Sequence, residues 1–477
     1  MSTFADAVIN QEARTENGMK ARASTASALV DLFFKAGASR GKDITRDFVA
    51  AYVADKNIAL RIAQWMRDAR GGAGERELFR QVLKYLEKND KDAAKALLAK
   101  VPEIGRWDDI FVFTDKELKT QAYTMLGDAL RAQNGLAAKW TPRKGETARE
   151  IREFFGMSPK FYRKSLVNLT KVVEQDMCAK NWDAINFSHV PSLAAARYKK
   201  AFNRNTQEYA KYVAELVKDP KDRTMNVKVN AGAVFPYDVL KGVIGAYSKN
   251  YDSTELNLLQ AQWDAMENFI GDANVLPLVD VSGSMCCAAG GSGSDSKTTC
   301  LDVAISLGLY MADKNKGKFK DTFLTFSSSP ELLHLTGNIV QKVQQMNSSN
   351  WGMSTDLVKA MDKILKTAKD GNVPQEEMPE MLMIMSDMQF NACAKFDDSA
   401  MQMMARKFEE AGYELPKIVF WNLNAKDNVP VKYDTRGVAL VSGFSPAIMV
   451  AVLGGDSEKF TPEAMMMKAI MVPRYDL

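Results

Sequence analysis

The stretch Val275-Leu-Pro-Leu-Val-Asp280-Val-Ser-Gly-Ser284 joins a short, continuously apolar run to a small polar loop. An apolar run of this length without alternation is typical of a strand buried on both faces of a parallel α/β sheet. Ligands bind such sheets outside the carboxyl ends of the strands. We therefore expect Asp280, Ser282 and Ser284 to lie at the ligand-binding edge of a sheet.

The sequence that follows repeats the alternation of strand and helix that defines a parallel α/β sheet. Helical patterns at about 298–313, 355–369, 398–411 and 446–453 separate the apolar runs. The alternation predicts a doubly wound, Rossmann-like α/β domain over residues 271–477. Its further strands are expected at 322–326, 381–385, 417–421 and 437–441.

Residues 24–270 have a different pattern, in which one helix follows another. Apolar side chains recur every three or four residues, as at Ile58, Ile62 and Trp65, and therefore share one helical face. Breaks rich in glycine and proline separate the segments. We expect a helical-repeat domain here, stacked like HEAT repeats into a solenoid or a ring, and an N-terminal arm over residues 1–23.

Two later segments add polar groups to the expected edge of the sheet. Ser386-Asp387 directly follows the apolar run 381–385, and Thr355 lies in the loop before a helix. Carboxylate and hydroxyl oxygens suit hard divalent cations, so we expect Mg²⁺, with Mn²⁺ or Ca²⁺ as alternatives. A D-x-S-x-S string alone is more often a loop or a helix cap, and the prediction depends on all three segments. The expected ligands are Asp280, Ser282, Ser284, Thr355 and Asp387.

The expected metal site favours binding over catalysis. A site with few carboxylates leaves the ion exchangeable water positions, so that a carboxylate or phosphate of a partner can complete the coordination shell. An aspartyl-phosphate phosphatase would need an acid/base carboxylate two residues after its nucleophile, where this chain has Ser282. The chain has only two histidines, His189 and His334. We therefore expect no enzymatic activity.

The cysteines and the absence of targeting signals indicate a cytoplasmic protein. Five cysteines in an irregular arrangement are typical of free thiols in a reducing compartment, and a C-x₂–₄-C pair for Zn²⁺ is missing. Cys286-Cys287, beside the polar loop, leave a reactive or redox-sensing pair as an alternative, and the Gly/Ser run 290–294 after them reads as a flexible insertion. No secretory signal and no apolar stretch of membrane-spanning length is visible, and we expect no membrane association.

Charge is distributed unequally between the two halves. Residues 1–250 hold 43 basic and 30 acidic side chains, whereas the remaining 227 residues hold 20 and 29. A basic half indicates a polyanionic partner, and basic groups interleaved with aromatic ones suit RNA. The alternative is that the aromatic residues are core and the lysines are merely solvated. The candidate RNA-binding residues are Lys139, Arg143, Lys144, Arg149, Arg163, Lys164, Lys199 and Lys200.

The segment Arg70-Gly-Gly-Ala-Gly-Glu-Arg76 resembles a phosphate-binding loop but lacks the G-x-x-x-x-G-K-[ST] pattern and a preceding strand. We interpret it as a turn between helices.

Helical repeats followed by this set of metal ligands resemble the Ro-type (TROVE-plus-vWA) ribonucleoproteins. The ligand set is that of the metal-ion-dependent adhesion site (MIDAS) of von Willebrand factor A (vWA) domains. The chain is similar, more closely, to vWA proteins shared by phages, plants and fungi. The strings that carry this second resemblance are Arg67-Asp-Ala-Arg-Gly-Gly-Ala-Gly-Glu-Arg-Glu-Leu-Phe79, Gly105-Arg-Trp-Asp-Asp109, Val229-Asn-Ala-Gly-Ala233 with Pro236, Ile418-Val-Phe-Trp-Asn-Leu423 and Gly437-Val-Ala-Leu-Val-Ser-Gly443.

The resemblance implies a TROVE-like ring of helical repeats closed by a vWA domain, with structured small RNA on a basic outer surface and single-stranded RNA ends in the ring. It implies a partner-docking role for the MIDAS. Our first hypothesis is therefore a non-enzymatic, monomeric, Ro-like RNA-binding protein, encoded by a phage. The alternative is a protein-binding scaffold or chaperone adaptor whose metal ion receives an acidic side chain of another protein.

Overall fold

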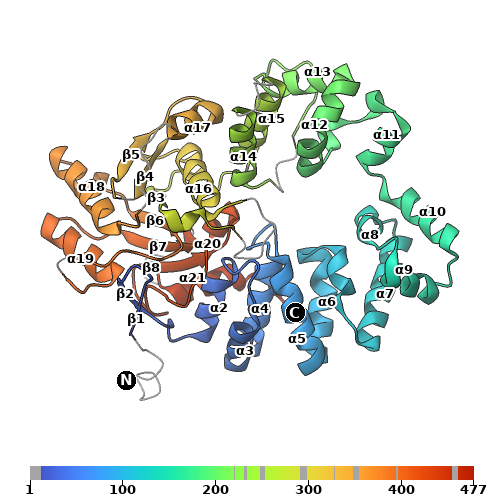
Figure 1. The fold of residues 1–477 in the computed structure, drawn as a ribbon, viewed down its shortest axis with the longest axis horizontal. Coiled ribbons are helices and arrows are strands. Elements are labelled where there is room, and N and C mark those ends of the chain that lie inside the picture. Colours follow the sequence, from blue (N-terminus) through green and yellow to red (C-terminus); the bar gives the residue numbers. More distant parts are fainter. Residues whose placement is uncertain are drawn as a thin grey trace.

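The computed structural model describes residues 12–219, 221–229, 234–247, 253–289, 298–326, 328–347, 354–393, 396–453 and 460–477. A mostly helical region leads into a C-terminal α/β domain built on a six-stranded sheet. The helices α2 to α15, which we call the arc, follow a curved path. This path leaves the α/β domain at α2–α4 and returns to it at α14 and α15 (Figure 1).

The sheet has the order β5-β4-β3-β6-β7-β8. All neighbouring strands pair in parallel except β5, which is antiparallel to β4. The five strands expected from sequence are confirmed. The sixth, β5, was not expected, because this short, half-exposed edge strand has no apolar run. Its antiparallel pairing makes the sheet mixed. The strands are β3 (Val275–Asp280), β4 (Thr322–Phe326), β5 (Glu331–His334), β6 (Met381–Ser386), β7 (Lys417–Asn422) and β8 (Val438–Ser442).

Strands β3 and β6 lie at the centre of the sheet, and the chain leaves them in opposite directions, toward β4 and β7. Right-handed crossovers place the helices that follow these two strands, α16 and α19, on opposite faces. Helix α16 lies so close to β3 that a Cβ on Gly308 would be 2.4 Å from Val279 Cγ2. The helices of this domain are α16 (Cys300–Lys314), α17 (Ile339–Asn347), α18 (Leu357–Asp370), α19 (Ala400–Ala411), α20 (Met449–Leu453) and α21 (Pro462–Ile470).

The arc is a stack in which successive helices pack against each other. From α2 to α6 each helix contacts the next, and α2, α3 and α4 also contact the second next, which is the packing of a solenoid. Side-chain caps set several of the helix starts: Asp55, Asp90 and Asp115 accept hydrogen bonds from the first free backbone N–H groups of α4, α6 and α7. The helices are α2 (Ala28–Ala36), α3 (Thr45–Ala54), α4 (Lys56–Arg67), α5 (Arg76–Asn89), α6 (Lys91–Ile104), α7 (Lys116–Arg131), α8 (Gly135–Trp140), α9 (Gly145–Phe154), α10 (Pro159–Thr170), α11 (Val173–Ala179), α12 (Ser192–Asn205), α13 (Gln207–Leu216), α14 (Pro236–Tyr247) and α15 (Ser253–Asp264).

The buried apolar residues form two separate clusters. The larger cluster runs without interruption from the helices α2–α10 into the sheet. The smaller cluster, centred on Phe187, Phe202 and Tyr209, holds α12 and α13 together with part of α15. Lys171, with a left-handed backbone (φ 41°), lies between α10 and α11 where one cluster gives way to the other.

The first joint between the arc and the α/β domain uses buried charged groups. Helix α2 ends directly on β8, because a Cβ on Gly37 would lie 2.3 Å from the Ser442 carbonyl oxygen. The buried Asp68 carboxylate accepts hydrogen bonds from Arg474 Nη2 (3.1 Å) and the Tyr475 hydroxyl (3.1 Å). These contacts tie the C-terminal residues to the end of α4.

The glycine-rich segment from Arg70 to Arg76 belongs to this first joint. It connects α4 to α5, which confirms its interpretation as a turn between helices. Gly72 packs against the backbone of α4, where a Cβ would lie 1.9 Å from the Trp65 carbonyl oxygen. The buried Glu75 pairs with Arg40 at 2.7 Å. The segment is therefore a tightly packed turn at the first joint.

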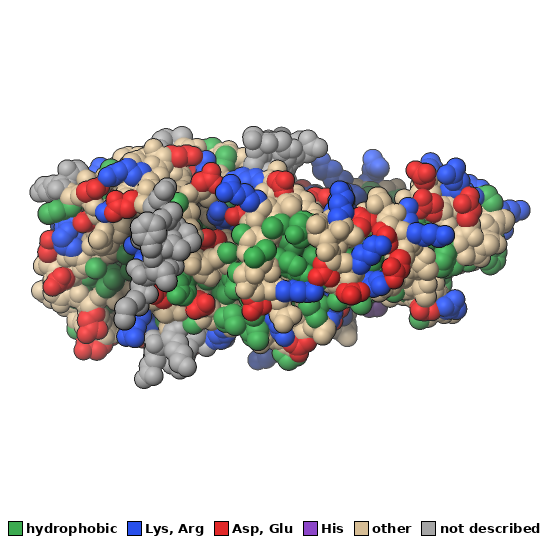
Figure 2. Space-filling view, turned by 90° about the horizontal axis from the view of Figure 1, so that it is seen from below, with side chains coloured by type: hydrophobic (Ala, Val, Ile, Leu, Met, Phe, Trp, Pro, Cys, Tyr) green, Lys and Arg blue, Asp and Glu red, His purple; other side chains and the backbone are tan. Residues whose placement is uncertain are grey.

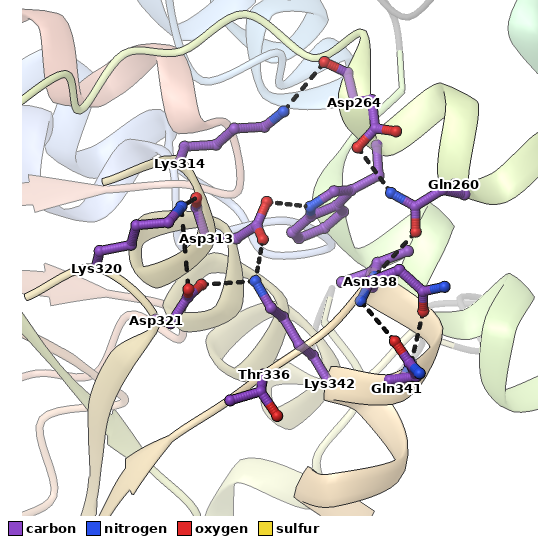
Figure 3. Close-up of polar contacts among 12 residues, drawn as sticks. Gln260, Asp264, Asp313, Lys314, Lys320, Asp321, Thr336, Asn338, Gln341 and Lys342 are labelled. Atoms are coloured by element: carbon purple, nitrogen blue, oxygen red, sulfur yellow. Dashed lines mark hydrogen bonds and ion pairs between the residues drawn. The ribbon is translucent and has the colours of Figure 1, made fainter. Parts of the chain in front are cut away.

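The second joint lies where α15 returns to the α/β domain (Figure 3). Trp263 on α15 donates from Nε1 to Asp313 on α16 at 2.7 Å. The buried Lys342 on α17 pairs with this same carboxylate and with Asp321, the latter at 2.6 Å. One lysine therefore neutralises two carboxylates, and one of these also holds the end of the arc.

Packing crosses the domain boundaries expected from sequence. The strands β1 (Glu12–Arg14) and β2 (Lys20–Arg22) form a hairpin in the expected N-terminal arm. This hairpin pairs with the α/β domain through bridges to Asn391, Ser399 and Val429. No helix among the described residues is long and apolar enough to cross a membrane.

We predict that Lys342→Met lowers the free energy of unfolding by about 3 kcal/mol, because it leaves two carboxylates without their counter-charge. Lys320→Met is the matched control, since Lys320 is largely exposed and lies 4.0 Å from Asp321, and a loss of about 0.5 kcal/mol or less is expected. Urea unfolding followed by tryptophan fluorescence measures both. Equal stabilities of the two variants would contradict the role given to Lys342.

Candidate functional site

The central strands bring the two predicted carboxylates to one edge of the sheet. Asp280 is the last residue of β3, and Asp387 follows the last residue of β6. The two strands pair in parallel with Val279 opposite Met385. Because the chain leaves β3 and β6 in opposite directions, their carboxyl ends form the switch point at which α/β sheets bind ligands.

Hydrogen bonds hold the Asp280 carboxylate in place. Its Oδ1 accepts from the backbone N–H of Ser282 at 2.9 Å, and its Oδ2 accepts from the Ser386 hydroxyl at 2.5 Å. All three residues are buried. Ser386 is therefore a positioning residue that sequence reasoning did not single out, although its place just before Asp387 at the end of a central strand could have suggested it.

The Asp387 carboxylate is incompletely satisfied. Its Oδ1 accepts from the Gln389 N–H at 3.2 Å, whereas its Oδ2 is buried and has no hydrogen-bond partner among the described residues. Burial raises the pKa of Asp387 and, together with the nearby charge of Asp387, raises the pKa of Asp280 to about 7. Two buried carboxylates that destabilise each other's charge are the arrangement that a bound cation would relieve.

The predicted hydroxyl ligands lie in two loops, the one after β3 and the one before α18. The Ser282 and Ser284 hydroxyl oxygens are 3.1 Å apart in the loop after β3. Thr355 is buried in the loop before α18, and its carbonyl accepts from the Asn391 N–H at 3.0 Å, which ties this loop to the segment after β6. Residues 348–353, which precede Thr355 in the chain, lie outside the described residues.

The donor set fits a hard divalent cation. It offers carboxylate and hydroxyl oxygens, an unpartnered buried oxygen and few negative charges, as Mg²⁺ or Mn²⁺ accepts when it keeps some of its water ligands. Within the described part of the chain no cluster of three or more His, Cys, Asp and Glu residues exists. An ion in the chain's carboxylate-poor site would therefore retain positions open to an external ligand.

Among the described residues, neither histidine of the chain lies at this edge. His334 ends the antiparallel strand β5, and its Nδ1 shares a hydrogen bond with the Thr322 hydroxyl (3.0 Å) at the beginning of β4. That is the amino end of β4, opposite the edge that carries Asp280. His189 lies in the arc, after α11.

All five cysteines are free thiols, as expected. The structure pairs Cys287 with Cys300 at a sulfur–sulfur distance of 3.5 Å, whereas Cys286 is exposed. Residues 290–297, which include the Gly/Ser run, lie outside the described residues.

The second candidate site is the basic surface of the arc, and five of its eight predicted residues have partners within the chain. Arg163 donates to the Pro159 carbonyl at 3.3 Å, and Lys139 lies 5.5 Å from the centre of the Trp140 ring. Arg143 donates to the Thr170 hydroxyl at 3.0 Å, Arg149 pairs with Glu146 at 3.5 Å, and Lys199 pairs with Glu255 on α15. The five residues other than Arg143, Arg149 and Lys199 have no ion pair among the described residues. They are Lys139 on α8, the exposed Lys144 before α9, the exposed Arg163 and Lys164 on α10, and the exposed Lys200 on α12.

The interleaved aromatic residues divide between core and surface. The Tyr162 hydroxyl donates to the Pro142 carbonyl at 2.6 Å, and Tyr198 donates to Glu174 at 3.0 Å. Trp140 is covered by the Arg106 guanidinium, 3.7 Å from its ring centre. Phe161 differs from these three, since it is 59% exposed on α10.

The surface of α10 concentrates positive charge. No acidic residue occurs between Glu153 and Glu174, whereas this interval holds Lys160, Arg163, Lys164 and Lys171. None of these four cations forms an ion pair with another described residue. On the face of the molecule seen in Figure 2, by contrast, basic and acidic side chains are interspersed, so positive charge is not continuous over that face.

The fold and the site define a class of protein in which a helical arc is anchored on an α/β domain with a polar switch point. Residues 274–470 match a domain of unknown function (DUF7788), and residues 15–102 and 131–274 match a second (DUF2828). The chain is 30% identical to uncharacterized protein L728 of Acanthamoeba polyphaga mimivirus, over 96% of this chain and 86% of that protein. The chain belongs to the family of this mimivirus protein.

Among solved structures, the Ro (RSR) protein of Deinococcus radiodurans matches 89% of this chain and 90% of its own, at 15% identity and a TM-score of 0.38. A TM-score this low transfers neither fold nor function.

We predict that Asp387→Asn changes stability in opposite ways with and without metal. In a chelator the variant should melt at the same temperature as the wild type or higher, because it removes one of two repelling buried carboxylates. With millimolar Mg²⁺ or Mn²⁺ the wild type should be stabilised and the variant should not. Thermal melts measure both arms.

Asp280→Ala should also abolish the response to metal, whereas Asp356→Asn, which alters the cap of α18 and an ion pair with Lys359, should retain it. A wild-type melting temperature that does not respond to either ion would overturn the metal assignment.

Proposed function

We propose that this protein is a non-enzymatic, cytoplasmic RNA-binding protein of the Ro type. In this proposal the arc is a TROVE-like ring of HEAT-like repeats, and the α/β domain is a vWA domain. Its MIDAS, formed by Asp280, Ser282, Ser284, Thr355 and Asp387, binds Mg²⁺ and docks an acidic or phosphate group of a partner.

The observation that carries the RNA proposal is the surface of α10. An exposed aromatic ring, Phe161, is accompanied on the same helix by the exposed cations Arg163 and Lys164. A base that stacks on an exposed ring gains about 1–3 kcal/mol, and neighbouring cations neutralise the phosphates on either side of it. Paired strands hide the faces of their bases, so this combination favours a single-stranded segment.

Charge supports the same conclusion over the neighbouring helices. Residues 135–171, which span α8 to α10, contain nine lysines and arginines and three glutamates, a net charge of +6. One of the glutamates, Glu150, is turned toward Lys119 on α7, to which it is bonded at 2.9 Å. The local excess of positive charge attracts a polyanion whatever its sequence.

The metal part of the proposal rests on the buried, unpartnered oxygen of Asp387 beside Asp280. When bound, Mg²⁺ would supply a positive charge with exchangeable water positions. Asp280 and Asp387 would hold the ion, Ser386 would orient Asp280, and the Ser282, Ser284 and Thr355 hydroxyls would complete the protein's share of the shell. Among the described residues neither histidine lies at this edge, and we infer docking of a partner group and not turnover.

A protein-binding scaffold is the second candidate function. Leu136, Phe154, Phe161 and Val167, all on α8–α10, are exposed and apolar, and such a surface also suits another polypeptide. The two functions differ in their dependence on salt, because only binding to phosphates releases many counterions.

We predict that Phe161→Ala weakens binding of a labelled single-stranded RNA oligonucleotide about 10-fold through the loss of one stacked base. Arg163→Ala combined with Lys164→Ala should reduce the slope of log affinity against log salt by roughly 1.4, the value for two phosphate contacts with a single strand. Fluorescence anisotropy at three salt concentrations measures both effects.

Lys366→Ala is the matched control, because Lys366 is exposed on α18, far along the chain from the basic helices, and pairs only with Asp370. Its affinity should equal that of the wild type. Affinity that does not vary with salt, or equal loss in all three variants, would rule out RNA binding by α10 and favour the scaffold.

A further inference from the structure

Two thiols that the candidate metal centre does not use lie together at the end of its loop. Cys287 follows the short 3-10 turn Gly283–Cys286 that carries Ser284, and Cys300 is the first residue of α16. Their sulfur atoms are 3.5 Å apart. The other three cysteines have no thiol neighbour of this kind among the described residues.

The backbone holds the two thiols in register. Ala288 and Thr299 form an antiparallel bridge, and the Cys300 N–H donates to the Cys287 carbonyl at 3.0 Å. Residues directly opposite each other in an antiparallel ladder have Cα atoms about 4.5–5.5 Å apart, within the range that a disulfide spans. The sulfur atoms need to approach by about 1.5 Å to reach bonding distance, which rotation of the half-buried Cys287 side chain can supply.

The surroundings of the two thiols differ. The Asn424 amide donates to Cys287 Sγ at 3.5 Å, and Lys42, from the arc, donates to Asn424 Oδ1 at 3.0 Å. Cys300 is buried, 1% exposed, and donates to the Leu423 carbonyl at 3.4 Å. Cys287 is therefore the accessible nucleophile, and Cys300 reacts with Cys287 alone.

We propose that Cys287 and Cys300 form a reversible disulfide by exchange with a small-molecule disulfide such as glutathione disulfide. The Cys287 thiolate attacks one sulfur of glutathione disulfide, the bond between its sulfur atoms breaks, and one glutathione leaves as a thiolate. The Cys300 thiol then attacks Cys287 Sγ and passes its proton to the departing glutathione thiolate, which leaves as the second glutathione thiol. Two protein thiols are oxidised, and one glutathione disulfide is reduced to two thiols.

The disulfide would join the turn that carries Ser284 to the first residue of α16. In the reduced protein this turn is held to α16 by hydrogen bonds of the short ladder and by packing of the buried Met285, without a covalent bond. A covalent link between these two elements reduces the conformational freedom of the unfolded chain. The oxidised protein should therefore melt at a higher temperature than the reduced protein.

The test uses the full chain in a chelator, so that the result does not depend on whether a metal binds. The protein is incubated with glutathione disulfide, remaining thiols are blocked with a maleimide, and peptides are identified by mass spectrometry. The wild type, with five cysteines, should take up three maleimides instead of five and yield a Cys287–Cys300 linked peptide. This measurement needs no variant.

Single substitutions separate the roles of the two thiols. Cys300→Ser should stop the reaction at one glutathione on Cys287, whereas Cys287→Ser should leave Cys300 unmodified. Cys286→Ser is the matched control and should behave as the wild type. A glutathione that persists on wild-type Cys287 without the internal link, or a link made by Cys286, would overturn the proposal.

Discussion

Parallel pairing of β3 with β6 is the constraint on which the candidate metal centre depends. The register that sets Val279 opposite Met385 brings Asp280 beside Ser386 and places Asp387 next along the same edge. Both carboxylates are buried, and burial of like charges without a counter-charge is unfavourable. The apolar strands behind this edge therefore hold two buried carboxylates whose negative charges repel each other. The short turn with Ser284 and Cys287 starts at the same edge.

The arc is attached to this domain at both of its ends, and each attachment uses buried charged groups with several partners. Asp68 makes the first joint with Arg474, while Asp313, neutralised by Lys342, makes the second with Trp263 of α15. Hydrogen-bonded charges in such positions tolerate few alternative arrangements, so they define geometry more sharply than apolar contacts do. The basic surface of α10 and the polar edge of the sheet are thereby carried on one frame.

The sequence predicts the α/β domain well because its strands are uniformly apolar and are separated by helical patterns. It does not predict β5, since Glu331-Leu-Leu-His alternates at an exposed edge and resembles a loop. Sequence places Asp280 and Asp387 at the edge of the sheet because each stands at the end of an apolar run that forms a strand. The pairing of Cys287 with Cys300 is not predicted, because the loop between them carries no pattern that brings its ends together. Likewise, the structure is needed to choose which basic residues of the arc are candidates for RNA binding. Nothing in the sequence distinguishes Lys199 and Arg143 from Arg163. In the structure Lys199 pairs with Glu255, and Arg143 donates to Thr170.

The division of the apolar core into two clusters has a consequence for the energetics of the arc. Each cluster is a unit that can open cooperatively by itself, and amide hydrogen exchange distinguishes such units by their separate opening free energies. The smaller unit around Phe202 shares no buried apolar cluster with α10, and the chain joins them through Lys171 in a left-handed conformation. The helices from α11 to α13 can therefore exchange their amides, or yield to a protease, while the sheet and the first nine helices of the arc stay folded.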